Sequence, residues 1–96
     1  MTFTPKRFKY DPRKAAANLH KHGISFEEAF TTFFDTRSIS DIDHAHSTPG
    51  DERFTLLGIS ARNRLLFIVH NEDDEVIRII SARAATPAET TLHEEA

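Results

Sequence analysis

Histidine is the residue type in this chain whose acid–base chemistry operates near neutral pH. Six histidines occur among 96 residues, and there is no cysteine to act as a nucleophile or a thiolate ligand. Two of them, His20 and His22, flank Lys21 where an alanine-rich segment ends at Gly23. Residues two apart on a helix point about 200° apart, so these two do not share one metal ion. Two roles remain open for His22: interaction with the carbonyl end of the helix, or a catalytic role.

A second group of candidate ligands lies in the middle of the chain, where Asp41, Asp43, His44 and His46 occur within six residues. In an extended segment the two aspartates face one side and the two histidines the other, which argues against a shared metal ion. The segment also runs into a loop with a Pro-Gly turn. We therefore expect no metal site here, and inhibition of activity by EDTA would reopen the question.

Two arginines are candidates for binding phosphate, because a guanidinium offers paired donors. Arg53 begins one predicted strand and Arg83 ends another. Simple hairpins would place them at opposite ends of a sheet, roughly 20 Å apart, unless a bend or different strand limits bring them closer. A salt bridge to a nearby carboxylate is the alternative for each. With three glycines, the sequence contains no glycine-rich phosphate loop.

Local patterns predict the elements that carry these residues. Asp11 followed by Pro12 is a typical helix start and Gly23 a typical stop, so a helix is predicted over 12–22. A capping-box pattern at Ser25 opens a second helix that ends near Asp35. Alternating and β-branched segments predict strands over 7–10, 38–43, 53–60, 64–71 and 76–83, and Thr86 begins a short final helix.

This order of elements predicts an α+β fold, with a small antiparallel sheet, two N-terminal helices packed on it and a short C-terminal helix. The length allows a single domain over residues 1–96. The longest apolar run, residues 65–69, is too short to span a membrane, and the N-terminus lacks the apolar stretch of a signal peptide. We therefore expect a cytoplasmic protein with no membrane partner.

The net charge of −3 is unevenly distributed. Residues 1–22 carry six Lys and Arg against one Asp, whereas residues 72–75 are all acidic and the segment from 86 adds three glutamates. A net charge of −3 does not indicate a nucleic-acid-binding protein. Charged, solvated faces that serve solubility would explain the uneven distribution. A basic surface on an acidic protein is nevertheless possible.

Several motifs occur together in a recognisable order. They are the segment from Phe8 to Ala29 (Phe-Lys-Tyr-Asp-Pro-x-Lys-Ala-x-x-Asn-x-x-Lys-His-Gly-Ile-Ser-Phe-x-Glu-Ala), Asp51-Glu52-Arg53, Gly58, and Arg78-Ile-Ile-Ser-Ala-Arg83. Together they resemble the BrnT family, the toxins of bacterial type II toxin–antitoxin systems. The resemblance covers about residues 7–89.

The resemblance implies an activity and partners that composition does not show. It implies a metal-independent endoribonuclease without a cofactor, with a RelE-like fold, that cleaves RNA by 2′-OH transesterification and inhibits translation. It also implies neutralisation by a BrnA-like antitoxin with a DNA-binding domain, through which the complex binds operator DNA. A catalytically weak homologue that serves mainly as an antitoxin-binding corepressor is the alternative, and an RNA- or DNA-binding module unrelated to toxins is a third possibility.

The matching positions imply site residues. The implied catalytic residues, with His22 as acid or base and the arginines holding phosphate, are His22, Arg53, Arg83 and Lys21. The implied RNA-binding residues are Tyr10, where the family usually has Trp, and Lys9 and Lys14. The tail departs from the family, because relatives often have a basic stretch and a Tyr where this chain is acidic. This departure predicts weaker RNA binding.

Overall fold

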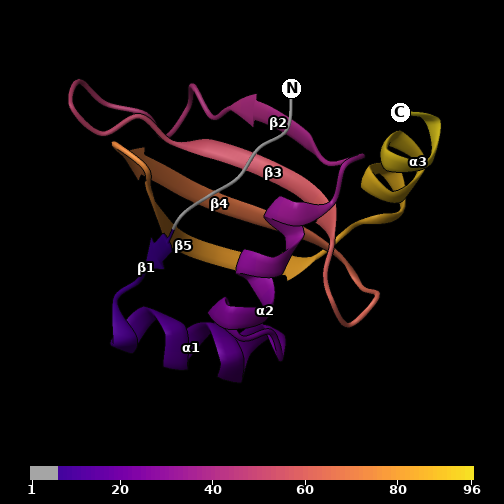
Figure 1. Ribbon diagram of the computed structural model, residues 1–96, viewed down its shortest axis with the longest axis horizontal. Coiled ribbons are helices and arrows are strands. Elements are labelled where there is room, and N and C mark those ends of the chain that lie inside the picture. The colour runs from indigo at the N-terminus through magenta and orange to yellow at the C-terminus, as the bar shows by residue number, and fades with distance from the viewer. Residues whose placement is uncertain (1–6) are drawn as a thin grey trace.

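The computed structural model describes residues 7–96, so the first six residues of the predicted domain, with the charge of Lys6, lie outside the described range. The strands are β1 (Arg7–Lys9), β2 (Ile39–Ile42), β3 (Phe54–Ile59), β4 (Leu65–Asp73) and β5 (Val76–Ala84). The helices are α1 (Pro12–His22), α2 (Phe26–Thr31), the 3-10 turn η1 (Thr32–Phe34) and α3 (Pro87–Glu95). One sheet, in the order β1-β5-β4-β3-β2, has α1 and α2 on one face and α3 near β3 (Figure 1).

The sheet differs from the predicted antiparallel arrangement at one edge. Strands β2 to β5 form the predicted antiparallel meander, but β1 pairs with β5 in parallel, with Phe8 opposite Ile77. The sheet is therefore mixed, and the prediction of a purely antiparallel sheet was wrong. The reason is that helices, not a hairpin, follow β1, and a helical crossover permits parallel pairing. In this position Phe8 stacks on Phe30 with 4.2 Å between ring centroids.

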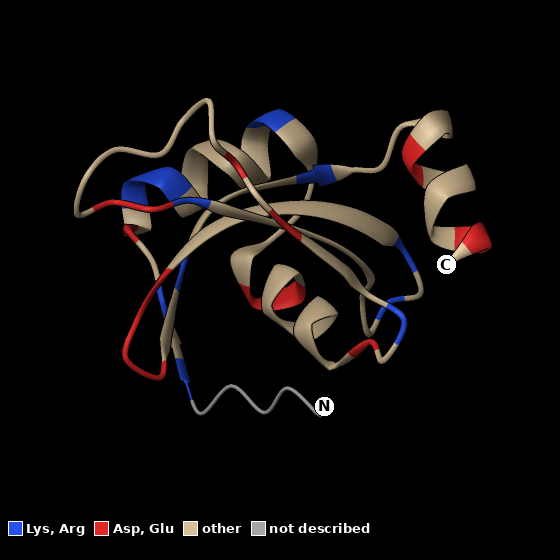
Figure 2. Ribbon diagram, turned by 90° about the horizontal axis from the view of Figure 1, so that it is seen from above, with Lys and Arg blue, Asp and Glu red and all other residues tan. Residues whose placement is uncertain are grey.

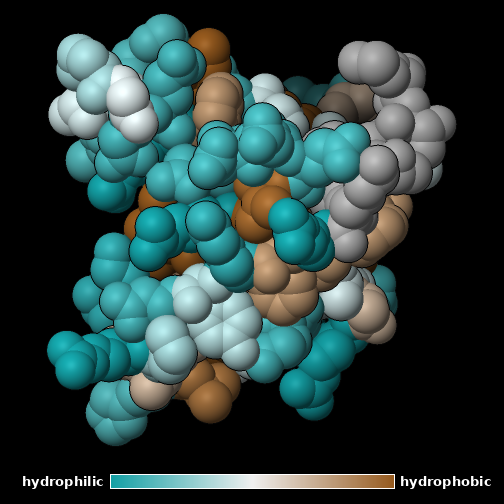
Figure 3. All heavy atoms as spheres, turned by 60° about the vertical axis from the view of Figure 1, so that its left-hand side comes forward, coloured by the Kyte–Doolittle hydropathy of each residue, from teal (hydrophilic) through white to brown (hydrophobic). Residues whose placement is uncertain are grey.

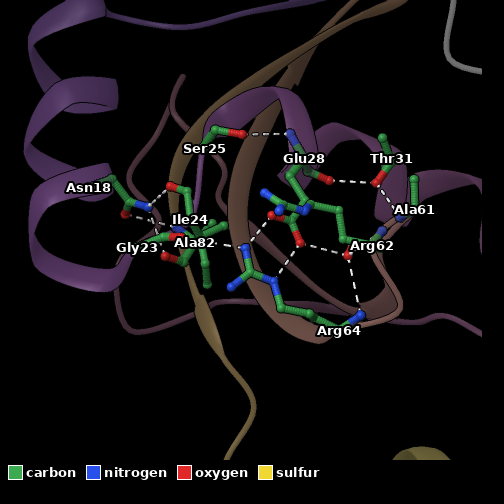
Figure 4. A network of polar contacts seen from close by, with 11 residues as sticks. Asn18, Gly23, Ile24, Ser25, Glu28, Thr31, Ala61, Arg62, Arg64 and Ala82 are labelled. Atoms are coloured by element: carbon green, nitrogen blue, oxygen red, sulfur yellow. Dashed lines mark hydrogen bonds and ion pairs between the residues drawn. The ribbon is translucent and has the colours of Figure 1, made fainter.

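Helix α1 lies beside the part of β5 that β1 leaves uncovered. β1 pairs with residues 76–78 of β5. Further along β5, at Ala82, the buried side chain of Asn18 takes the place of a neighbouring strand. Asn18 Nδ2 donates to the Ala82 carbonyl at 2.9 Å, and Oδ1 accepts from the Ala82 N–H at 3.1 Å. Nδ2 also donates to the Ile24 carbonyl at 3.0 Å. The amide thus acts like one residue of a neighbouring strand and ties α1 to the sheet (Figure 4).

The turn between α1 and α2 is held by a second set of polar contacts, around Glu28 (Figure 4). Ser25 caps α2, as predicted, by accepting from the Glu28 N–H at 3.0 Å. The buried Glu28 carboxylate accepts from Arg64 Nε at 2.9 Å, from Arg64 Nη2, and from the Ser60 hydroxyl at 2.7 Å. The hydrogen bonds from Arg64 lower the pKa of Glu28, although burial opposes them. We call this region the α1–α2 corner, formed by Asn18, Gly23, Ser25, Glu28 and Arg64.

The hydrophobic core lies between these helices and the sheet. It consists of Ile24, Phe26, Ala29, Phe33, Leu56, Leu66, Ile68, Ile77, Ile79 and Ala82. The second predicted helix does extend to residue 34, but its last turn is the 3-10 turn η1. Gly58 allows this turn to approach β3 closely, because a Cβ at Gly58 would lie 2.9 Å from the Thr32 carbonyl oxygen.

His70, near the end of β4, is part of the interior of the protein. His70 is 3% exposed and lies between the rings of Phe33 and Phe54, at centroid distances of 4.9 and 5.7 Å. Burial lowers the pKa of His70 to about 4. The imidazole is therefore neutral in the folded protein at neutral pH.

The C-terminal helix α3 is fastened to the rest of the molecule by polar contacts. Thr86 and Glu89 form a capping box at its start, and buried His93 contacts the Asp35 carboxylate at 3.0 Å. Burial raises the pKa of Asp35, but hydrogen bonds from backbone N–H groups and from His93 outweigh it and leave this pKa below its usual value. Among the helices of residues 7–96, none is long and apolar enough to cross a membrane.

Candidate active site

The face of the sheet opposite α1 and α2, the open face, carries both arginines singled out in the sequence. Leu57 pairs with Phe67 and Phe67 with Arg83, so these three side chains share one face. The next residue of β3, Gly58, faces η1, so this row faces away from the helices. Arg53 lies four residues before Leu57, about 13 Å along the strand. The strand register therefore brings the arginines closer along the sheet than simple hairpins would.

A pocket of about 630 Å³ lies on the open face. Its lining comes from β2, the following loop and the three central strands, and consists of Asp41, Ile42, Asp43, His46, Arg53, Thr55, Phe67, Val69, Ile80 and Ser81. A cation, carboxylates, an imidazole and hydroxyls thus surround an aromatic ring. The end of the molecule with the 43–53 loop and the β4–β5 turn is mainly hydrophilic, with small separate hydrophobic patches (Figure 3). Such a surface suits a polar ligand.

A carboxylate from α3 holds Arg83 in place. Arg83 Nη1 and Nη2 donate to the two carboxylate oxygens of Glu89 at 2.8 and 2.9 Å. The guanidinium lies 4.3 Å from the centre of the Phe67 ring, which lines the pocket. The hydrogen bonds raise the pKa of Arg83 and lower the pKa of Glu89. The salt bridge left open as an alternative for Arg83 is present, so a phosphate must compete with Glu89.

Arg53 is less completely paired than Arg83. Its Nη2 lies 3.6 Å from Oδ2 of Asp51, beyond hydrogen-bond distance, while Asn71 Nδ2 donates to the other oxygen of Asp51 at 3.1 Å. Arg53 Nε is buried and has no hydrogen-bond partner within the described part of the chain. The side chain is 31% exposed. Arg53 is therefore a partly exposed and loosely paired cation at the pocket wall, which suits an anionic oxygen.

A histidine–aspartate pair, which the sequence analysis did not assign, lines the same pocket. His46 Nδ1 lies 2.8 Å from Oδ2 of Asp43. The expectation that these side chains face opposite ways was wrong, because residues 43–46 form a turn in which the His46 N–H donates to the Asp43 carbonyl at 3.3 Å. The Asp-x-x-His spacing just before a Pro-Gly turn is the signal that could have revealed the pair. An imidazole oriented by a carboxylate can accept and return a proton.

The other members of this acidic and histidine-rich segment do not complete a metal site. Asp41 lines the pocket, but one of its carboxylate oxygens accepts from the N–H of Ile42 at 2.8 Å. His44 is exposed. Across residues 7–96, no group of three or more His, Asp or Glu side chains is arranged to hold a metal ion.

The predicted catalytic pair Lys21 and His22 lies elsewhere. Both side chains are exposed at the end of α1, where Gly23 takes a left-handed conformation with φ of 69°. The Gly23 carbonyl accepts from Arg64 Nη2 at 3.4 Å, and Arg64 lies at the β3–β4 turn, the end of β3 opposite to Arg53. Six residues of strand, about 20 Å, separate these two ends. The structure does not bring His22 near Arg53, so the role of His22 stays a prediction.

The predicted RNA-binding residues are also separated from the pocket. Tyr10 packs against the core, and its hydroxyl donates to Glu27 at 3.3 Å. Lys14 is exposed on α1. Lys9 lines a different pocket of about 610 Å³, together with Arg78 and five carboxylates, those of Asp51, Glu52, Glu72, Asp73 and Asp74. The acidic residues of the β4–β5 turn stand out in Figure 2. Because carboxylates outnumber cations there, this second pocket disfavours phosphate.

Comparison with known proteins points to one family. The family model described as "Ribonuclease toxin, BrnT, of type II toxin-antitoxin system" matches residues 10–89. The fold is similar to that of the crystal structure of the Brucella abortus ribonuclease toxin BrnT, with a TM-score of 0.54 and 20% sequence identity. This similarity covers 83% of the present chain and 96% of the other. A search of curated proteins found no match.

Proposed function

Because the chain belongs to the BrnT family of ribonuclease toxins of type II toxin–antitoxin systems, we propose that it cleaves RNA at the pocket on its open face. The family implies an antitoxin partner and an RNA target. The reaction we propose is a metal-independent transesterification. The 2′-oxygen attacks phosphorus and the bond to the 5′-oxygen breaks, which leaves a 2′,3′-cyclic phosphate and a 5′-hydroxyl end.

The observation that carries this proposal is the placement of Arg53 and Arg83 on one face of the sheet. Arg83 lies over the Phe67 ring, and Arg53 lines the pocket to which this ring belongs. Negative charge develops on the phosphate oxygens as the 2′-oxygen attacks, and preorganised cations stabilise it most strongly. The Arg53 side chain is 31% exposed and its Nη2 lies 3.6 Å from Asp51, so the guanidinium can turn its terminal nitrogens to a phosphate. Arg83 is already oriented by Glu89 and by the ring.

The acid–base part of the reaction has two candidate histidines. The resemblance assigns it to His22 with Lys21, in which case RNA must reach the end of α1, and Tyr10, Lys9 and Lys14 extend the contact. The geometry instead offers His46 beside Arg53. Both assignments are proposals, and His22→Ala and His46→Ala variants separate them.

The remaining parts of the proposal concern the biological setting. We propose that RNA cleavage inhibits translation, that the neutralising partner is a BrnA-like antitoxin, and that the complex binds operator DNA through that antitoxin. A RelE-like arrangement of two helices against a small sheet belongs to the same proposal. The packing of α1 and α2 against one face of the sheet supports it.

One observation favours a second candidate function. Glu89 already occupies the guanidinium of Arg83, and the tail helix is acidic. A catalytically weak homologue that acts mainly as an antitoxin-binding corepressor would show this arrangement. Expression of the chain without an antitoxin distinguishes the two, because growth arrest supports the ribonuclease and normal growth supports the corepressor.

The direct test is RNA cleavage by the purified chain in the presence of EDTA. We expect products with 2′,3′-cyclic phosphate ends, and a rate about 100-fold lower for Arg53→Ala. Arg13→Ala, which removes an exposed arginine from α1, is the matched control and keeps the parent rate. Loss of activity in EDTA, or an Arg53→Ala variant as fast as the parent, contradicts the proposal.

A further inference from the structure

We propose that His46, oriented by Asp43, is the group that takes the 2′-OH proton during RNA cleavage in the open-face pocket. This inference rests on the proposed ribonuclease function and adds to it the identity of the proton acceptor. It depends on four features of the structure: the pairing of the two side chains, the attachment of their turn to Arg53, the free side of the imidazole and the locations of the other histidines.

The turn that carries the pair is bonded directly to the backbone of Arg53. The Asp43 N–H donates to the Arg53 carbonyl at 2.8 Å, and the Arg53 N–H donates to Oγ of Ser47 at 2.9 Å. The Ser47 hydroxyl in turn donates to the Asp43 carbonyl at 2.7 Å. The residues on both sides of the imidazole are therefore fixed relative to the arginine. A phosphate held by Arg53 lies beside a histidine of defined position.

The exposure of the two side chains suits the roles we assign to them. The Asp43 side chain is 18% exposed and the His46 side chain 71% exposed, so the carboxylate is covered while the imidazole is open to the pocket. Asp43 contacts Nδ1 of His46, which leaves Nε2 facing away from the carboxylate. A carboxylate on Nδ1 favours the tautomer whose Nε2 accepts a proton and stabilises the imidazolium that results.

The proton transfers of this step use the His46 imidazole and water. The proton of the 2′-OH passes to Nε2 of His46 as the 2′-oxygen bonds to phosphorus. The bond from phosphorus to the 5′-oxygen then breaks, and the leaving oxygen takes a proton from water that reaches the open pocket. The imidazolium afterwards releases its proton to solvent. The charged groups that face the imidazole across the pocket are Asp43, Asp41 and Arg53, and no cofactor is needed.

The other histidines have different surroundings. His70 is enclosed by aromatic rings and His93 is buried against a carboxylate. His20 and His22 belong to α1, on the opposite side of the sheet from the pocket, and His44 is exposed without lining it. His46 is thus the histidine that lines the open-face pocket together with Arg53.

The test is the single-turnover cleavage of a short RNA by His46→Ala, with His44→Ala as the matched control. His44 is also exposed, lies two residues away and does not line the pocket. We expect His46→Ala to cleave at least 100-fold more slowly than the parent, with RNA binding unchanged within about twofold, and His44→Ala to keep the parent rate. Added imidazole should restore part of the rate of His46→Ala. Asp43→Asn, a positioning variant, should lower the rate at saturating RNA about tenfold and leave RNA binding unchanged within about twofold.

The outcomes distinguish this inference from the function on which it rests. If the parent cleaves RNA and His46→Ala is equally fast, or if imidazole gives no rescue, the inference is overturned and the ribonuclease function stands. If the slow variant is His22→Ala, the acid–base role returns to the end of α1. If the parent does not cleave RNA under any of these conditions, the proposed function and the inference fail together.

Discussion

The α1–α2 corner and the open-face pocket both contain arginine, carboxylate and amide or hydroxyl groups, but their hydrogen bonding is opposite in character. In the corner, the polar atoms of Asn18 and Glu28 are buried and bonded to fixed partners. In the pocket, Arg53 has an unpaired Nε and His46 is largely exposed. The first arrangement contributes to folding, whereas the second leaves groups available for a ligand.

The longest family motif contributes residues to the α1–α2 corner. The segment from Phe8 to Ala29 holds most of the residues that suggested a toxin, yet the structure gives several of them folding roles. Asn18 completes the edge of β5, Gly23 ends α1, and Ser25 caps α2. A dense motif can therefore identify the family through residues that stabilise the fold. The shorter motifs around Arg53 and Arg83 reach the pocket.

The largest expected effect is the loss of stability in Asn18→Ala. The substitution leaves the N–H and carbonyl of Ala82 and the carbonyl of Ile24 without their present partner, which costs about 3 kcal/mol of unfolding free energy. Urea denaturation measures it. Asn71→Ala, which removes one hydrogen bond to Asp51, the carboxylate next to Arg53, is the control and should cost less than about 1 kcal/mol. Equal losses in the two variants would remove the distinction between corner and pocket.

Folding stability is expected to depend on pH through His70. Its pKa is about 4 in the folded protein and about 6.5 in an unfolded chain, so the unfolded state binds the extra proton between these values. Stability is full above pH 6.5 and falls by about 3 kcal/mol as the pH drops to 4. The lowered pKa values of Glu28, Asp35 and Glu89 act at lower pH, because their contributions are lost below their ordinary range.

The measurement is urea denaturation at pH 7 and at pH 5 for the parent and for His70→Leu. We expect the difference between the two pH values to shrink in His70→Leu and to persist in His44→Ala, which changes an exposed imidazole. An unchanged difference in His70→Leu would show that the buried imidazole does not control this range.

A smaller effect is expected for Gly23→Ala at the end of α1. Gly23 has φ of 69°, where an alanine is strained, although no atom lies within 4 Å of the position of an added Cβ. The variant should lose about 1 kcal/mol of unfolding free energy. Its cleavage rate at saturating RNA should equal that of the parent if the end of α1 lies outside the site. A large drop in rate with little loss of stability would return catalysis to the Lys21–His22 pair.

The smallest expected effect is a gain in RNA binding in Glu89→Gln. Neutralising Glu89 removes the carboxylate that competes with phosphate for Arg83, so the Kd for RNA should fall about threefold at low salt. Glu95→Gln changes the net charge equally but lies at the end of α3, and it should change the Kd less. Weaker binding in Glu89→Gln would mean that the carboxylate mainly positions Arg83.

Much of the fold was predictable because its signals are local. Asp11, Ser25 and Thr86 cap the three helices and Gly23 ends α1, as the sequence predicts. The meander from β3 to β5 follows from apolar and β-branched segments joined by short connections. The parallel pairing of β1 with β5 was not predictable in this way, since it depends on contacts between residues about 70 positions apart.

The site was predictable only in part, for a related reason. Residue type indicated that Arg53 and Arg83 could bind phosphate, but strand register decided how far apart they lie. The pairing of His46 with Asp43 depends on a turn, and an extended reading of the same residues gives the opposite orientation. The burial of His70 depends on Phe33 and Phe54, which belong to other elements.

By itself, the sequence determined the family, the elements and their ends, because caps, periodicity and motif spacing act over a few residues. The tertiary structure alone decided that the acidic chain keeps two arginines on an open face, and that a histidine–aspartate pair stands beside one of them. It also decided that Asn18 serves as part of a strand edge. These outcomes depend on which distant segments meet, and that is set by packing of the whole chain.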